Sequence, residues 1–338
     1  MDDQALLNVT KPILKECCGS EPISIKSLAK TYHSATFLLI TEDGSKVILK
    51  THNLSYLCAA YVLSVQQILN HLEYQNQLIN NVRDLTRSPG MKTVFGKTVF
   101  EEDGICFSLY DFVEGQEYDV NDLNEKQKLQ VIELLSKIHK IPVDSIDPIF
   151  LEQKKIYGLN LVRPLENKNK IMNGLSQASL LFKDKETLEI LNNKFASLNL
   201  KDFFIDQLSG DDIVFAHNDI KPKNILWMSE EIFSLIDWEA VYLFPRTIDV
   251  VETVASFSMV KKQDNYDIDT RLYKKLIRCY EAFSGVSLKI QENDILISVL
   301  RQLFWMSKCF EGQNYEAAKD AWYKLAALTN SFEELKYG

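Results

Sequence analysis

The chain contains 338 residues, of which 46% are hydrophobic and 25% are charged, so it is long enough for one large or two modest globular domains. Its formal net charge of -9 argues against a nucleic-acid partner, because proteins that bind nucleic acids usually carry a basic surface. No apolar run reaches the ~18 residues of a membrane-spanning helix, and acids stand where a signal peptide would be basic. The six cysteines form no C-x-x-C pair, so we expect reduced thiols and a cytoplasmic location.

The first 110 residues are expected to combine strands with helices. Apolar residues recur at helical intervals in residues 4–18, and residues 55–84 are also expected to be helical. Between these helices, apolar runs flank a turn at residues 42–45, which is typical of a β-hairpin. The expected strands lie within residues 22–50, near residues 92–100 and at residues 105–110.

The chain changes character at residues 110–115, where a strand ends in an acidic segment that closes with glycine. Further on helices are expected to dominate, and an amphipathic helix near residues 125–140 stops before Pro142. Residues 150–210 carry no motif that we can interpret, and we expect a helical insertion there that shapes a substrate cleft. Strands are expected near residues 213–216, 225–228 and 232–236.

Residues 217–239 carry the most informative pattern in the chain. Asp219 follows a histidine and an asparagine, Asn224 comes five residues later, and Asp237 ends an apolar run further on. Phosphoryl transfer needs a carboxylate that takes or orients the proton of the substrate hydroxyl, and oxygen ligands for magnesium held near that carboxylate. Asp219 is therefore the candidate catalytic base, and Asn224 and Asp237 are the candidate Mg²⁺ ligands.

This stretch resembles the catalytic and metal-binding loops of the aminoglycoside phosphotransferase and choline kinase family, the small-molecule branch of the protein-kinase-like fold. The resemblance implies an α+β fold with two lobes. It places a small, β-rich nucleotide-binding lobe at residues 1–110, a hinge at residues 111–116 and a larger, mostly helical lobe at residues 117–338, which holds the catalytic and metal loops and the substrate cleft.

Details of the two motifs distinguish the branches of this fold. Protein kinases carry Asp-Phe-Gly at the second motif, so the sequence Asp237-Trp238-Glu239 favours small-molecule kinases over protein kinases. Lys221, two residues after Asp219, is a protein-kinase-like detail that weakly favours the other branch. The His-Asn-Asp opening of the first motif is similar to the choline kinase subgroup.

The resemblance also implies which residues bind the nucleotide. Lys50 ends an apolar strand and resembles the lysine that contacts the nucleotide phosphates, with Glu73 on the following helix as its expected acidic partner. The loop expected to cover the phosphates contains no glycine, which departs from the glycine-rich pattern, and Ser34 is its candidate phosphate donor. The backbones of Asp111 and Val113 are expected to bind the adenine.

Other residues near the motifs are assigned supporting roles. His217 is expected to brace the catalytic loop by hydrogen bonding, and Asp249 to anchor the same loop from a buried position. Trp238 is expected to pack in the interior. Glu239 is expected either to meet a cationic group of the substrate or to lie on the loop surface.

The sequence therefore predicts a Mg²⁺-dependent phosphotransferase that uses ATP or GTP to phosphorylate a hydroxyl of a small molecule. The expected acceptor is cationic: an aminoglycoside-like amino sugar, which would make the protein an antibiotic-resistance enzyme, or alternatively choline, ethanolamine or another metabolite. A non-catalytic nucleotide-binding protein is a further alternative, and the glycine-free loop is its only support. The protein is expected to be a monomer or a homodimer.

Overall fold

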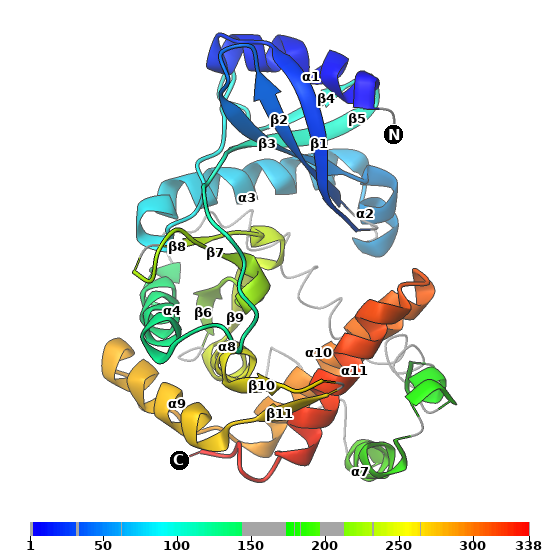
Figure 1. Ribbon diagram of the computed structural model, residues 1–338, viewed down its shortest axis with the longest axis vertical. Helices are drawn as coiled ribbons and strands as arrows, with labels where there is room; N and C mark the ends of the chain where they lie inside the picture. The colour runs from blue at the N-terminus through cyan, green and yellow to red at the C-terminus, as the bar shows by residue number, and fades with distance from the viewer. Residues whose placement is uncertain are drawn as a thin grey trace.

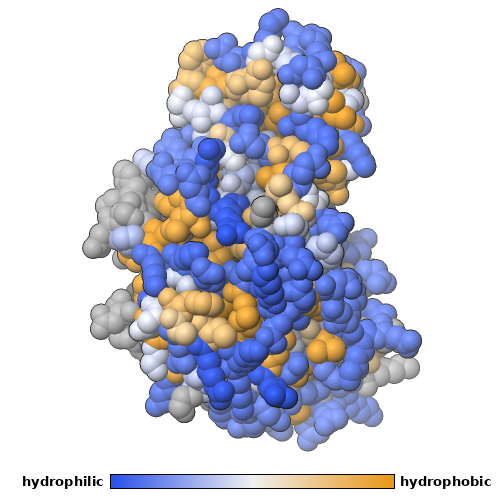
Figure 2. Space-filling model, turned by 60° about the vertical axis from the view of Figure 1, so that its left-hand side comes forward, coloured by the Kyte–Doolittle hydropathy of each residue, from blue (hydrophilic) through white to orange (hydrophobic). Residues whose placement is uncertain are grey.

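The computed structural model describes residues 3–31, 34–61, 63–143, 174–178, 180–182, 184–196, 213–231, 233–263 and 265–337. Most of the insertion expected at residues 150–210 lies outside these described residues. Figure 1 shows a sheet with helices at the N-terminal end of the molecule and a larger, mostly helical part at the other end. Hydrophilic residues cover most of the face seen in Figure 2, with separate apolar patches between them.

The N-terminal part is built on a five-stranded antiparallel sheet with the strand order β1-β2-β3-β5-β4. The register places Lys50 of β3 between Thr36 on β2 and Ser108 on β5, in the middle of the sheet. The strands are β1 (Pro22–Lys30), β2 (Ser34–Thr41), β3 (Lys46–His52), β4 (Val99–Glu102) and β5 (Ile105–Asp111).

One face of this sheet is covered by helix α1 (Asp3–Cys18), and the other face is directed at the rest of the molecule. Leu49 of β3 is fully buried in the same cluster as Leu6 and Leu14 of α1. Because successive side chains of a strand point to opposite faces, Lys50 is directed away from α1. The alternation in β3 therefore places its lysine on the face that looks toward the helical part.

The single helix expected at residues 55–84 is divided into α2 (Leu54–Tyr61) and α3 (Val65–Thr86). Ser64 begins α3 with a capping box, in which its hydroxyl accepts from the Gln67 amide and the Gln67 side chain accepts from the Ser64 amide. The strand expected near residues 92–100 begins only at Val99. Before it, Met91 and Val94 form isolated bridges and no continuous strand.

The C-terminal part contains helices and three two-stranded antiparallel pairs, and the strands expected at residues 213–236 are confirmed within one or two residues. The helices are α4 (Glu125–Ile138), α7 (Lys185–Ala196), α8 (Arg246–Ser258), α9 (Thr270–Ser284), α10 (Glu292–Glu311) and α11 (Tyr315–Asn330). The pairs are β6 (Ile213–Ala216) with β9 (Tyr242–Pro245), β7 (Ile225–Trp227) with β8 (Phe233–Leu235), and β10 (Met259–Lys261) with β11 (Tyr266–Ile268).

These elements share a large apolar core, which includes fully buried side chains such as Tyr273, Tyr280 and Trp322. Figure 1 shows α3 running between the sheet and the β7–β8 pair, so this helix lies at the junction of the two parts. None of the helices in the described ranges combines the length and hydrophobicity needed to cross a membrane. All six cysteines are free.

Candidate active site

The catalytic loop follows β6 and is fixed by His217, whose side chain is fully buried. The Asp219 amide donates to His217 Nδ1 over 3.3 Å, so Nε2 carries the proton and donates to the Ile236 carbonyl over 3.1 Å. Burial lowers the pKa of the His217 imidazole, which keeps it neutral. Both ring nitrogens are used, and the expected role of His217 as a brace is confirmed.

The structure brings the three predicted phosphoryl-transfer residues together. The Asn224 amide nitrogen donates to both the carbonyl and Oδ2 of Asp219, each over 2.8 Å. The Ile236 amide donates to the Asn224 carbonyl over 2.9 Å, which places Asp237, the next residue, beside the catalytic loop. Asp237 has a positive φ of 64°, and its side chain is 39% exposed. This conformation turns the chain after β8, so the carboxylate is accessible.

Lys50 meets two acids from this segment and not the expected Glu73. Its Nζ lies 2.8 Å from Asp237 Oδ1 and 2.9 Å from Glu239 Oε1, and its side chain is only 13% exposed. Burial alone lowers the pKa of the Lys50 ammonium, but the two carboxylates outweigh burial and the net pKa is raised. The Lys50 charge in turn lowers the pKa of Asp237. The pair is therefore ionised on both sides.

The expected pairing of Glu73 with Lys50 differs from the structure because of the rotation of α3. The Glu73 carboxylate accepts hydrogen bonds of 2.9 Å from the amides of Thr98 and Val99 at the start of β4. The buried face of α3 instead presents Gln75 and Asn76. Glu73 therefore holds the beginning of a strand, and the acids that meet Lys50 come from the segment after β8.

Helix α3 contacts the segment that carries Asp237 at two points that the sequence did not reveal. The Gln75 side chain donates to the Trp238 carbonyl. At the end of α3, the Arg87 carbonyl accepts from the Ser234 hydroxyl over 2.8 Å and from the Leu235 amide over 3.3 Å. The sequence signal that could have pointed to this contact is that Gln75 is a polar residue on the buried face of an amphipathic helix. These bonds fasten α3 to the strand that leads into Asp237.

Trp238 is buried as expected, with its indole nitrogen donating to the Leu235 carbonyl over 3.1 Å. Asp249 is buried as well, but the hydrogen bond of its carboxylate joins it to His139 at the end of α4, over 2.9 Å. Within the described ranges it makes no hydrogen bond to the catalytic loop, so the expected direct anchor is not found. Asp249 supports the helices beneath the loop.

Lys221 forms an ion pair with the candidate base. Its Nζ lies 2.7 Å and 2.9 Å from the two carboxylate oxygens of Asp219. Burial lowers the pKa of Lys221, but the charge of Asp219 more than compensates and the net pKa is raised. A protonated lysine and the amide of Asn224 thus hold the Asp219 carboxylate from two directions.

The segments expected to bind the nucleotide make their own contacts. The Asp111 amide donates to the Gly90 carbonyl over 2.7 Å, so this amide is already engaged. The Asp111 carboxylate pairs with Lys92 over 2.7 Å. Val113 is half-buried. The Ser34 hydroxyl lies 3.3 Å from that of Thr31 across the β1–β2 turn. Nucleotide binding by these residues stays a prediction.

Asn224 and Asp237 form a donor set that fits Mg²⁺. Because the Asn224 amide nitrogen is engaged by Asp219, its Oδ1 is the atom available to a cation, and Asp237 adds a carboxylate. Mg²⁺ prefers oxygen ligands and commonly takes one or two from protein and the rest from phosphates and water. In the described part of the chain, no group of three or more His, Cys, Asp and Glu side chains is arranged around a common metal position. The residues therefore fit a metal shared with a bound nucleotide.

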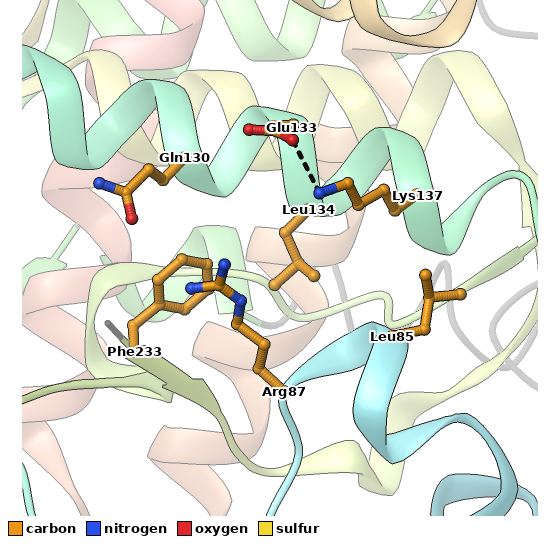
Figure 3. Close-up of a pocket in the computed structure, with 7 residues that line it drawn as sticks. All are labelled: Leu85, Arg87, Gln130, Glu133, Leu134, Lys137 and Phe233. Atoms are coloured by element: carbon orange, nitrogen blue, oxygen red, sulfur yellow. Dashed lines mark ion pairs between the residues drawn. The ribbon is translucent and has the colours of Figure 1, made fainter. Parts of the chain in front are cut away.

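A separate pocket lies between the end of α3, α4 and β8 and contains none of these residues (Figure 3). There the Arg87 guanidinium lies 4.6 Å from the centre of the Phe233 ring, and Lys137 pairs with Glu133 over 2.7 Å. Its basic groups already have partners, so no function is assigned to this hollow.

The antiparallel sheet with its inward lysine, the helical part and the Asp219–Asn224–Asp237 arrangement define a protein-kinase-like phosphotransferase with a small β-rich lobe and a larger helical lobe. The chain belongs to the phosphotransferase enzyme family, whose family model matches residues 24–280. The expected fold class and the expected family are confirmed.

Solved structures share this fold at low sequence identity. A spectinomycin phosphotransferase in complex with ADP and spectinomycin is 15% identical, with a TM-score of 0.62 over 99% of both chains. An aminoglycoside 2'-phosphotransferase in complex with GDP is 15% identical, with a TM-score of 0.60 over 98% of this chain and 99% of the other. A choline kinase from Cryptosporidium parvum is 12% identical, with a TM-score of 0.52 over 98% and 95%. No curated protein sequence matches the chain significantly.

Proposed function

We propose that this phosphotransferase moves the γ-phosphate of ATP or GTP to a hydroxyl of a small molecule in a Mg²⁺-dependent reaction. The observation that carries the proposal is the hydrogen-bonded connection from Asp219 through Asn224 to Ile236, the residue before Asp237, with Lys50 ion-paired to Asp237. Similar structures are complexes with ADP and with GDP, which supports a nucleoside triphosphate as donor.

Each residue takes a role that its contacts allow. Asp219 would accept or orient the proton of the acceptor hydroxyl. Asn224 and Asp237 would hold Mg²⁺, which supplies positive charge to the phosphate oxygens when it is bound. Lys50 is protonated and lies beside Asp237, so it would contact the phosphates of the same nucleotide. The Lys50 contact also favours a donor-side role for Glu239 over contact with the acceptor.

For the acceptor we propose an amino sugar of the aminoglycoside type, with choline or ethanolamine as the second candidate. The similar structures include enzymes named for both classes of acceptor. The acidic net charge of -9 suits a cationic acceptor of either class. A turnover assay with spectinomycin, several aminoglycosides, choline and ethanolamine would identify the class.

The mechanism is tested by Asp219→Asn, which removes the charge and keeps the shape of the side chain. We expect kcat to fall by about 10²- to 10⁴-fold, because general-base and orienting effects contribute on this scale. A thermal shift with Mg-ATP should stay close to that of the wild type. Asp84→Asn is the matched control, because this carboxylate is fully exposed on α3. Full turnover by Asp219→Asn would contradict the mechanism, and nucleotide binding without any turnover in the wild type would favour a non-catalytic protein.

A further inference from the structure

Asn218, the residue before the candidate base, has a backbone conformation that needs support. Its φ is +64°, in the left-handed region that L-residues with a Cβ adopt at a cost. Asn218 is buried, and it connects β6 and His217 to Asp219. Its backbone angles set the direction in which the chain leaves toward Asp219, so a change at Asn218 would redirect the Asp219 carboxylate.

Apart from its backbone N–H, the polar groups of Asn218 are hydrogen-bonded to residues outside the catalytic loop. Arg301 Nη2 donates to the Asn218 carbonyl over 3.0 Å, and Arg301 Nη1 donates to Asn218 Oδ1 over 3.4 Å. Asn218 Nδ2 donates to the Ala240 carbonyl over 3.2 Å. Arg301 therefore donates hydrogen bonds to both the main chain and the side chain of Asn218, which has a left-handed backbone conformation.

Arg301 is itself fixed between α8 and β9. Its Nε lies 3.2 Å from Glu252 Oε1 on α8, and its guanidinium carbon lies 4.8 Å from the centre of the Phe244 ring on β9. The side chains of Arg301 and Glu252 are only 19% and 17% exposed. A planar guanidinium reaches Glu252 and two oxygens of Asn218 together, whereas a lysine ammonium is a point charge that cannot span this geometry.

The acid beside Arg301 is strongly desolvated. Burial raises the pKa of the Glu252 carboxyl to about 8, and the adjacent guanidinium of Arg301 acts in the opposite direction. The guanidinium is therefore the neighbouring charge that favours the ionised form of this buried carboxyl.

We infer that Arg301 is a positioning residue for phosphoryl transfer, which holds Asn218 in its left-handed conformation and thereby aims Asp219 at the acceptor hydroxyl. The inference rests on the proposed function, because it assumes that Asp219 acts on the acceptor. Arg301 touches Asn218 and not the reacting atoms, so its loss is expected to lower kcat and to spare nucleotide binding.

The first test compares Arg301→Gln and Arg301→Lys with Arg271→Gln, a matched surface arginine on α9. We expect both Arg301 variants to lose roughly 10- to 100-fold in kcat, since small misplacements of a reacting group cost this much. KM for the nucleotide and the Mg-ATP thermal shift should stay near wild type. Arg301→Lys keeps the charge beside Glu252, so it tests the loss of geometry in a folded protein. Wild-type kcat in Arg301→Lys and Arg301→Gln would overturn the inference.

The second test uses Asn218→Gly, because glycine adopts the left-handed conformation without a Cβ penalty. The kcat loss caused by Arg301→Gln should be several-fold smaller in the Asn218→Gly background than in the wild type. An equal loss in both backgrounds would show that Arg301 does not act through Asn218.

A third measurement separates this inference from the proposed function. Amide hydrogen exchange of residues 217–227 should be faster in Arg301→Gln than in the wild type and unchanged in Arg271→Gln. If the wild type phosphorylates no acceptor, the proposed function fails and the exchange measurement still decides the role of Arg301. Unchanged exchange in Arg301→Gln would overturn the inference.

Discussion

The Lys50 ammonium lies 2.9 Å from the Glu239 carboxylate, so a side-chain ion pair joins the central strand of the N-terminal sheet to the segment after β8. We expect Glu239→Gln to lower kcat/KM for the nucleotide about 10-fold, because Lys50 loses one of the two carboxylates that hold it in place. Glu73→Gln is the matched control. It weakens the hydrogen bonds to Thr98 and Val99, so it should lower stability by about 1 kcal/mol and leave kcat/KM near wild type. A larger kinetic loss in Glu73→Gln than in Glu239→Gln would restore Glu73 as the functional acid.

Lys221 contacts both oxygens of the candidate base, so Lys221→Met removes the cation that orients the Asp219 carboxylate. We expect kcat to fall roughly 10- to 100-fold, because small misplacements of a reacting group cost this much. The measurement is kcat at one pH, with the exposed Lys289→Met as control. Wild-type kcat in Lys221→Met would show that the ion pair does not orient Asp219.

Because His139 and His217 are buried, we expect the free energy of unfolding to fall at acidic pH. Burial lowers the pKa of His139 and His217 below the ordinary value of 6.5. Around and below pH 6.5 the unfolded chain therefore binds more protons than the folded chain. The stability that the two neutral histidines contribute is fully present above pH 6.5 and is lost as the pH falls below it. Each histidine should contribute a loss of up to about 1.4 kcal/mol per pH unit.

The check for these histidines is the free energy of unfolding from urea titrations at pH 7.5, 6.5 and 5.5. His139→Gln should unfold more easily at pH 7.5, because His139 bonds both Asp249 and Tyr280. Its stability should also depend less steeply on pH than that of the wild type. Equal slopes in the two proteins would mean that the pKa of His139 is the same in the folded and unfolded states.

An alanine at Gly90 tests which part of Asp111 serves the nucleotide. A Cβ at position 90 would collide with the carboxylate of Asp111 and the guanidinium of Arg83. Both side chains are about half exposed and can move, so Gly90→Ala should displace Asp111 from Lys92 and lower stability by only about 0.5 kcal/mol. If the backbone of Asp111 binds adenine, KM for the nucleotide should stay near wild type in both Gly90→Ala and Asp111→Ala. A KM raised several-fold in both variants would show that the carboxylate takes part instead.

The sequence predicted local features of the fold better than contacts between distant elements. Strand alternation and helical periodicity located most elements, and the motif spacing brought Asp219, Asn224 and Asp237 into one site as expected. The partner of Lys50 was not predictable, because it depends on how α3 is rotated about its axis when it packs on the sheet. Glu73 and Gln75 differ by only two positions, yet they face β4 and Trp238 respectively.

Arg301 was beyond sequence reasoning for a related reason. It is one charged residue on a long amphipathic helix, and it meets Asn218 across 83 positions of the chain. No local pattern reports such a contact, because it arises only when α10 packs against α8 beside the catalytic loop. Residues that act through the backbone of others leave no motif, while residues that need a fixed chemical type and spacing do.

The two attachments of α3 constrain how the enzyme can open. Gln75 and the Arg87 carbonyl bind the stretch that leads from β8 through Trp238, and Lys50 binds Asp237 in the middle of that stretch. The Ile236 amide and carbonyl also bind Asn224 and His217 of the catalytic loop, so the same stretch is held from both sides. A rotation of the N-terminal sheet away from the catalytic loop would therefore have to break either the Lys50–Asp237 pair and the α3 contacts or the hydrogen bonds of Ile236.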